Sequence, residues 1–137
     1  EEIRLPEVPM AASAVSAHPP VRQFLLALQR RLAAENNVIM DGRDIGTVIL
    51  PDAKVKIFLT ASAQRRAYRR WQELKEKGAS DTYEQVLADV EQRDYNDSHR
   101  EIAPLRQAPD AVLVDTTQLD LEASIDRVQQ IIAEHLD

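Results

Sequence analysis

The chain has 137 residues, a formal net charge of −6, 44% hydrophobic and 29% charged residues, which predicts about one soluble acidic domain. No run reaches the roughly 20 apolar residues that a membrane span requires, and no charged-then-apolar leader opens the sequence. We therefore expect a cytoplasmic protein. The sequence has no cysteine, and its histidines are scattered, so it predicts no disulfide, no thiolate chemistry and no metal site.

Arginine is over-represented among the basic residues. Of 17 basic residues, 13 are arginine and 4 are lysine. The planar guanidinium presents paired donors that suit bidentate binding of phosphate or carboxylate. A codon-biased genome would produce the same excess, so only the positions of the arginines can decide between the two explanations.

Apolar spacing predicts the secondary structure in chain order. Two helices are expected within the first 35 residues, separated by His18-Pro19-Pro20 and closed by Asn36-Asn37. Three apolar runs predict buried parallel strands, at residues 38–40, within 54–60 and at 111–114. Further helices are expected over 62–78, over about 81–102 and after residue 120. Their predicted caps and stops are Ser62, Gly78, Asp81, Pro104 and Asp120.

Strands that alternate with helices predict an α/β fold, a parallel sheet with flanking helices. Three strands make a thin sheet, so we expect either an edge covered by another chain or missing strands. We divide the chain into residues 1–37, the two helices, and residues 38–137, the rest of an α/β domain.

The segment DGRDIGTVILPDA follows the first predicted strand and carries Arg43 and Asp44. Ligands bind beyond the carboxyl ends of strands in open parallel sheets, so these two residues stand where a site is expected. Gly42 and Gly46 permit a close backbone approach. The alternative is a local Arg-Asp pair in a tight turn.

The segment QRDYNDSHR places Arg93, Asp97 and Arg100 at i, i+4 and i+7, on one helix face. Two arginines beside one carboxylate can hold an anion while the carboxylate accepts hydroxyl protons. The alternative is a surface i, i+4 ion pair that contributes a few tenths of a kcal/mol.

The segment SAQRRAYRRW contains what we call the arginine cluster: Arg65, Arg66, Arg69 and Arg70. Like charges at this spacing weaken an isolated helix, which favours a polyanionic partner, either nucleic acid or a nucleoside triphosphate. A solvated face neutralised by Glu73 and Glu76 is the alternative. Trp71 is expected to pack under the helix. The sequence has no GxxxxGK[ST] phosphate-binding loop.

Five segments together resemble bacterial cytidylate kinase: IRLPEVPMAASAVSAHPPVR, DGRDIGTVILPDAKVKIFLTAS, RRAYRR, QRDYNDSHREIAPL and VDTT. They occur in that family's order and cover nearly the whole chain. The resemblance is to the C-terminal part of the enzyme and implies a P-loop kinase-like fold, incomplete on its N-terminal side. It also implies ATP as phosphoryl donor, Mg²⁺, and CMP or dCMP as acceptor. We expect the 137 residues alone to be inactive, because the P-loop carries donor binding.

The resemblance assigns roles to individual residues. It implies that Ser13, Arg22 and Asp44 read the cytosine, and that Arg43 and Arg100 hold the acceptor phosphate. Asp97, supported by Arg93, would bind the sugar hydroxyls. Residues 1–37 would close the nucleotide-monophosphate-binding region, and about 62–80 would be a lid whose arginine cluster meets the donor phosphates. The residues expected to act in catalysis are Arg43, Arg66, Arg69, Arg70 and Arg100.

Other functions remain open from the sequence. The chain could be a non-catalytic module that binds nucleic acid through the arginine cluster, although its acidic net charge makes a nucleic-acid partner unfavourable. It could be an interaction domain that pairs through a sheet edge, or a kinase for another nucleotide such as uridine monophosphate. A partner could be the N-terminal half of the same enzyme or a second copy; no membrane partner is expected.

Overall fold

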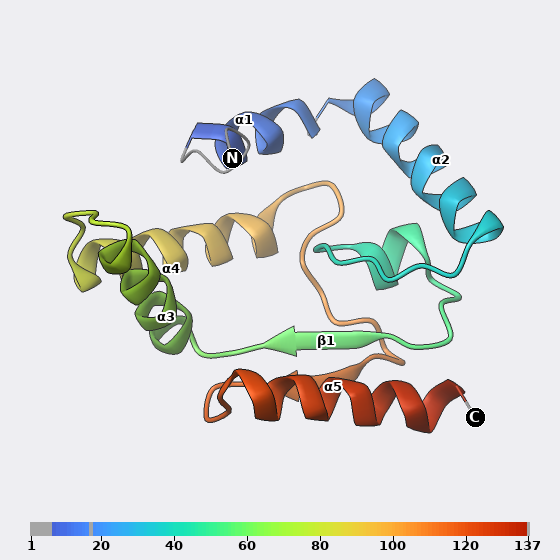
Figure 1. The fold of residues 1–137 in the computed structure, drawn as a ribbon. Helices are drawn as coiled ribbons and strands as arrows, with labels where there is room; N and C mark the ends of the chain where they lie inside the picture. Colours follow the sequence, from blue (N-terminus) through green and yellow to red (C-terminus); the bar gives the residue numbers. More distant parts are fainter. Residues whose placement is uncertain (1–6, 17, 137) are drawn as a thin grey trace. The chain divides into compact units, whose positions relative to one another are not determined.

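A computed structural model describes residues 7–16 and 18–136. The chain divides into two units, Glu1–Asp41 and Gly42–Asp137, and each is described by itself. Figure 1 colours the chain from its N-terminus in blue to its C-terminus in red. Among the described residues, none of the helices combines the length and the apolar character that crossing a bilayer demands.

The first unit consists of helices α1 (Glu7–Ser16) and α2 (Pro19–Glu35), which pack on each other. His18 is the extended N-cap of α2, and proline occupies the first turn, where a missing N–H costs no helical hydrogen bond. Asn36 ends α2, and its Nδ2 donates to the Leu32 carbonyl at 3.1 Å. The predicted pair of helices is confirmed.

The strand predicted at residues 38–40 is wrong. These residues are neither helix nor strand, and Ile39 is 96% exposed. A short apolar run becomes a strand only where another strand offers its N–H and C=O groups. Within the described part of the chain, no strand pairs with this run.

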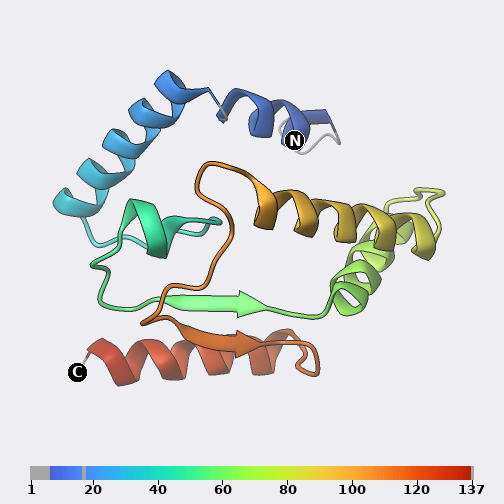
Figure 2. The ribbon, with the colours of Figure 1, turned by 180° about the vertical axis from the view of Figure 1, so that it is seen from behind.

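The second unit contains a parallel pair of strands, β1 (Ile57–Thr60) and β2 (Val112–Asp115). Their register runs from Ile57 opposite Val112 to Thr60 opposite Asp115. Figure 2 shows both arrows pointing the same way, with α5 (Leu121–Leu136) alongside. Packing of α5 on β2 buries Val114 and Ile131, which are 3% and 1% exposed. The predicted parallel α/β class and these two strands are confirmed.

Helices α3 (Ala63–Glu76) and α4 (Tyr83–His99) pack against each other as a hairpin. The Ser62 hydroxyl accepts from the Arg65 N–H at 3.2 Å, and Gly78 has a left-handed φ of 80° beyond the end of α3. The predicted cap and stop of this helix are therefore confirmed. Trp71 packs at the hairpin as predicted, with its ring centroid 6.3 Å from that of Tyr83.

The predicted bounds of the second hairpin helix need two corrections. Thr82, rather than Asp81, is the N-cap of α4, because Thr82 and Gln85 exchange two hydrogen bonds, of 3.3 and 2.8 Å, in a capping box. The helix ends at His99, before Pro104. There the backbone turns extended at Arg100, and the Leu105 N–H donates to the Asp97 carbonyl at 2.8 Å. Asp120 caps α5 as predicted, accepting from the Ala123 N–H at 2.8 Å.

The segment after Asp44 forms a π-helical turn, η2 (Ile45–Ile49), an element that the sequence analysis did not predict. The Asp44 carbonyl accepts from the N–H groups of Val48 at 2.9 Å and Ile49 at 3.2 Å. Such turns are rare and occur frequently at functional sites. This turn leads, through residues 50–56, into β1.

Candidate functional site

The carboxylate of Asp97 joins two stretches of the second unit that lie far apart in the sequence. Arg43, just before η2, donates its Nε hydrogen to Asp97 Oδ2, and Nε of Arg93 lies 4.0 Å from the same oxygen. The Asp97 side chain is 20% exposed, whereas that of Arg93 is 57% exposed. Because Arg43 approaches from a separate segment, Asp97 does more than complete a surface i, i+4 pair on α4.

Arg43 and Arg100 are anchored in the same way. Arg100 is the C-cap of α4, and its Nε donates to the Ala103 carbonyl at 2.6 Å, while Arg43 uses its Nε on Asp97. Within the described residues, the terminal nitrogens of these two guanidinium groups donate to no protein acceptor. Each group is therefore held through one edge, and its paired terminal donors remain available for an anion.

Asp44 is the N-cap residue of η2 and is 8% exposed, which makes it one of the few buried charged residues of the described chain. The sequence left open a local ion pair between Arg43 and Asp44. The ion pair that Arg43 forms goes to Asp97 instead. Asp44 is thus buried within the segment that also carries an anchored arginine.

The arginine cluster does not act as one group of equivalent charges. Arg66 binds Asp94 of α4 with both terminal nitrogens, at 2.8 and 2.5 Å, and its Nε donates to the Ala61 carbonyl at 2.9 Å. The hydrogen bonds from Arg66 hold the pKa of the Asp94 carboxyl below its usual value. Every nitrogen of this guanidinium is engaged, so Arg66 ties α3 to α4.

Arg69 forms its hydrogen bonds with a different part of the second unit. Its terminal nitrogens donate to the Thr116 hydroxyl at 3.2 Å, the Thr116 carbonyl at 2.7 Å and the Leu119 carbonyl at 2.8 Å. These acceptors belong to the connection between β2 and α5. Arg69 therefore fixes α3 to the carboxyl end of the sheet.

The guanidinium groups of Arg65 and Arg70 have fewer contacts with the protein than those of Arg66 and Arg69. The Arg65 guanidinium lies 6.0 Å from the centre of the Tyr68 ring, and its buried Nε has no hydrogen-bond partner among the described residues. Arg70 is exposed and forms no hydrogen bond or ion pair within the described part of the chain. The cluster thus contains two arginines bound to protein acceptors, Arg66 and Arg69, and two without such hydrogen bonds among the described residues.

The carboxyl ends of both strands are joined by a small polar network. Asp115 accepts from the Thr117 N–H at 2.8 Å and from its hydroxyl at 2.5 Å, while that hydroxyl accepts from the Ser62 N–H at 2.9 Å. The hydrogen bonds from Thr117 lower the pKa of Asp115. Across residues 7–16 and 18–136, no group of three or more His, Cys, Asp or Glu side chains is arranged to hold a metal ion.

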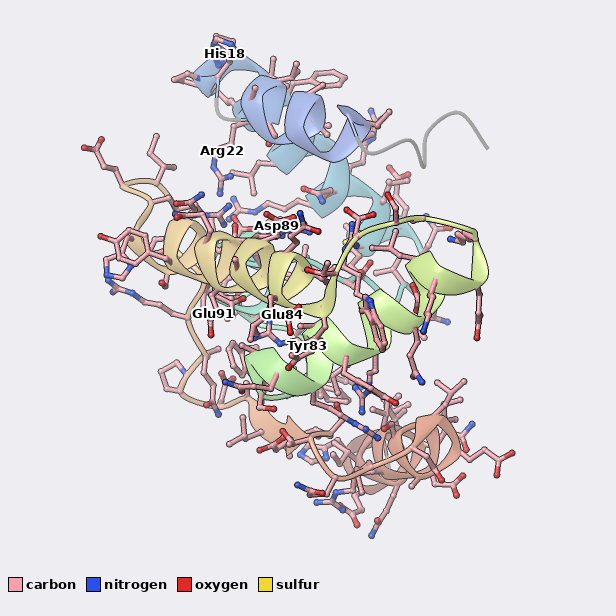
Figure 3. The ribbon with its side chains drawn as sticks, turned by 90° about the vertical axis from the view of Figure 1, so that its left-hand side faces the viewer. His18, Arg22, Tyr83, Glu84, Asp89 and Glu91 are labelled. Atoms are coloured by element: carbon pink, nitrogen blue, oxygen red, sulfur yellow. The ribbon has the colours of Figure 1, made fainter. Side chains whose placement is uncertain are left out.

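Two predicted site residues belong to the first unit. Arg22, labelled in Figure 3, lies in the first turn of α2, where its N–H donates to the His18 carbonyl at 3.0 Å. Ser13 lies in α1, and its side chain is outside the described ones. Their assignment to a base stays a prediction.

Several partners in this site were missed by sequence reasoning. Asp94, Thr116 and Lys56 were not singled out, although each holds a segment that carries a predicted site residue. A signal existed for Lys56, since a lysine at the start of a buried strand needs a partner. No local signal pairs Arg66 with Asp94, because the two are 28 residues apart on different helices.

Comparisons with a family model and with individual known proteins point to the same family. A sequence model of the family described as cytidylate kinase matches residues 1–134. A cytidylate kinase of Thermosipho melanesiensis is 49% identical over 133 residues, which cover 97% of this chain and 61% of that protein. One of Carboxydothermus hydrogenoformans is 52% identical over 100% of this chain and 62% of its own length. A cytidylate kinase of Caldicellulosiruptor saccharolyticus is 53% identical over 96% of this chain and 58% of its own length.

Substitution of Arg69 should reveal its structural role. We expect Arg69→Ala to lower the free energy of unfolding by about 1.5–3 kcal/mol, because the Thr116 and Leu119 carbonyls lose a charged donor. Arg70→Ala, in the same cluster, should change it by less than about 0.5 kcal/mol. Urea unfolding followed by circular dichroism measures both. Equal losses in the two variants would contradict the division of the cluster.

The pair of Arg66 and Asp94 should make stability depend on pH. The pKa of Asp94 is lowered in the folded chain, so its contribution is complete above the unfolded pKa of about 3.9 and disappears as pH falls through the folded pKa. Asp94→Asn should therefore lose less stability than the unsubstituted chain between about pH 6 and pH 3. Urea titrations read by Trp71 fluorescence measure this loss.

The control for this titration is Glu91→Gln, which changes an exposed carboxylate of the same helix, labelled in Figure 3. This variant should keep the acid sensitivity of the unsubstituted chain. If Asp94→Asn and Glu91→Gln lost stability equally on acidification, the pair would not be the source of the effect.

Proposed function

The chain belongs to the cytidylate kinase family, and from this premise we propose that it takes part in transferring the γ-phosphoryl group of ATP to CMP or dCMP, giving CDP or dCDP. It spans about 60% of the length of the curated relatives it matches. The proposal is therefore made for the whole enzyme. Within it, these residues supply contacts to the acceptor nucleotide and an arginine-rich lid at about 62–80.

The observation that carries the proposal is the anchoring of Arg43 and Arg100 through Nε alone. A phosphate monoester offers oxygens that accept two parallel N–H bonds from one guanidinium. Because both side chains are already fixed, little side-chain entropy remains to be lost on binding. This geometry supports Arg43 and Arg100 as the groups that hold the acceptor phosphate.

Asp97 has the chemistry required for a sugar. Both guanidinium groups that approach it do so at Oδ2, and Oδ1 accepts no hydrogen bond within the described residues. A carboxylate oxygen held in this way can accept from a ribose hydroxyl. We therefore assign the sugar to Asp97, with Arg93 beside it.

For the base, we propose the residues that the sequence motifs indicate, which are Ser13, Arg22 and Asp44. Cytosine carries an exocyclic amine that donates, and uracil carries a carbonyl at the same position. A carboxylate such as Asp44 accepts from the amine and repels the carbonyl. Its burial supports this choice, because a hydrogen bond to a buried charge discriminates strongly between donor and acceptor.

Phosphoryl transfer requires positioning and positive charge more than a side-chain nucleophile. An oxygen of the acceptor phosphate bonds to the γ-phosphorus of ATP as the bond from that phosphorus to the ADP oxygen breaks. We assign Arg65 and Arg70 to the donor phosphates, since Arg66 and Arg69 are engaged within the protein. No residue of the described ranges is assigned to Mg²⁺, because they contain no suitable cluster of ligands.

This function is favoured over a non-catalytic module that binds nucleic acid through the arginine cluster. Such binding needs several charges free to contact successive phosphates. Arg66 and Arg69 are bound to protein acceptors, and the chain is acidic overall.

Calorimetric titration of the chain with CMP, and with cytidine as the phosphate-free control, tests the acceptor site. We expect CMP to bind more tightly than cytidine. Arg100→Lys should weaken CMP binding by about tenfold while leaving cytidine unchanged, because lysine cannot offer the paired donors. Arg106→Lys changes an exposed arginine nearby and should have no effect. Failure of the unsubstituted chain to bind CMP would refute the proposed acceptor site.

Base selection is tested by Asp44→Asn. An amide both donates and accepts, so we expect CMP binding to weaken by about ten- to a hundredfold and the preference for CMP over UMP to narrow. Arg70→Ala should leave this preference unchanged. Circular dichroism establishes that the variant is folded, which matters because Asp44 is buried. An unaltered ratio of CMP to UMP affinity in Asp44→Asn would remove Asp44 from the base site.

A further inference from the structure

Lys56, immediately before β1, has a side chain that is only 7% exposed. Its ammonium group donates to the Pro51 carbonyl and to the Asp110 carboxylate, the latter at 2.6 Å. Burying an ammonium group is costly unless it is paired and hydrogen-bonded. The ammonium group of Lys56 therefore holds together the two segments that carry its acceptors, Pro51 and Asp110.

The aliphatic part of Lys56 contacts η2. A β-carbon placed on Gly46 would lie 3.4 Å from Lys56 Cδ and 3.7 Å from its Cγ. The stem of the lysine thus runs along the backbone of η2, while its ammonium group reaches the turn that follows η2 and Asp110, two residues before β2. One side chain joins the π-helical turn to the start of both strands.

The π-helical turn needs such support. A single turn fixes many backbone dihedrals with few hydrogen bonds, so it gains little stability by itself. Two of its bonds, from the Val48 and Ile49 N–H groups, end on the Asp44 carbonyl. A shift of η2 against the sheet therefore moves Asp44 and the adjoining Arg43.

We propose that Lys56 is a positioning residue for the acceptor-nucleotide site: it holds η2 against the two strands and thereby sets Arg43 and Asp44 before the nucleotide binds. This proposal rests on the proposed function. Lys56 itself touches no nucleotide. Its contribution is preorganisation, which reduces the ordering that binding would otherwise require.

The test compares Lys56→Met with Lys54→Met. Methionine keeps much of the stem that covers Gly46 and removes the ammonium group, while Lys54 is an exposed lysine two positions earlier. We expect Lys56→Met to bind CMP about tenfold more weakly, and Lys54→Met to bind as the unsubstituted chain does.

Amide hydrogen exchange separates positioning from a general loss of stability. In Lys56→Met the amides of Val48, Ile49 and Leu50 should exchange faster, while those of Val112 and Thr116 in and beside the sheet should keep their rates. Asp110→Asn, at an exposed side chain, should change both readouts in the same direction and by less, which keeps the test available if Lys56→Met does not fold. Faster exchange throughout the second unit would overturn the positioning role.

The outcomes distinguish failure of the positioning role from failure of the proposed function on which it rests. If the unsubstituted chain binds CMP and Lys56→Met binds it equally well, the positioning role is wrong and the proposed function stands. If the unsubstituted chain does not bind CMP, the proposed function fails, and the role of Lys56 at that site fails with it. Weaker CMP binding together with exchange that accelerates only at residues 48–50 supports both.

Discussion

The contact between Arg43 and Asp97 is the interaction on which the candidate site depends. It connects residues 54 positions apart, one just before η2 and the other near the end of α4. η2 is a single turn, and α4, which packs on α3, ends at His99, so this contact ties a short turn to the end of a packed helix. A charged hydrogen bond between partly buried groups is strong enough to define the arrangement. Two residues proposed for the acceptor site, Arg43 and Asp97, thus meet in the second unit.

The arginines differ in which nitrogens they use on the protein, and this difference separates those that hold the fold from those proposed to bind an anion. Arg66 and Arg69 use their terminal nitrogens on Asp94, Thr116 and Leu119, so the part of the guanidinium suited to phosphate is already engaged. Arg43 and Arg100 use Nε, which fixes the group and leaves those donors available. Arginine in this chain therefore serves contacts within the fold and, as proposed, anion binding.

The sequence predicted elements where local chemistry decides and failed where a distant partner decides. The cap at Ser62 follows from the residues beside it, and it is present. The strand predicted within 54–60 is present as Ile57–Thr60, where β2 pairs with it. The expected strand at 38–40 shows the same apolar pattern but has no pairing strand among the described residues. For the site, spacing brought Arg93 and Asp97 together on one helix, whereas the contact of Arg43 with Asp97 depends on the fold.

Lysine at position 56 satisfies a geometric requirement that arginine does not. Its ammonium donors point in three directions and reach a carbonyl and a carboxylate on different segments, while the slim stem passes over the backbone of Gly46. A planar guanidinium spreads its donors in one plane and needs more room. The Arg66 guanidinium, by contrast, faces the two paired oxygens of the Asp94 carboxylate. Lys56 thus joins two segments through one carbonyl and one carboxylate, and the arginines bind carboxylates, carbonyls and, as proposed, phosphates.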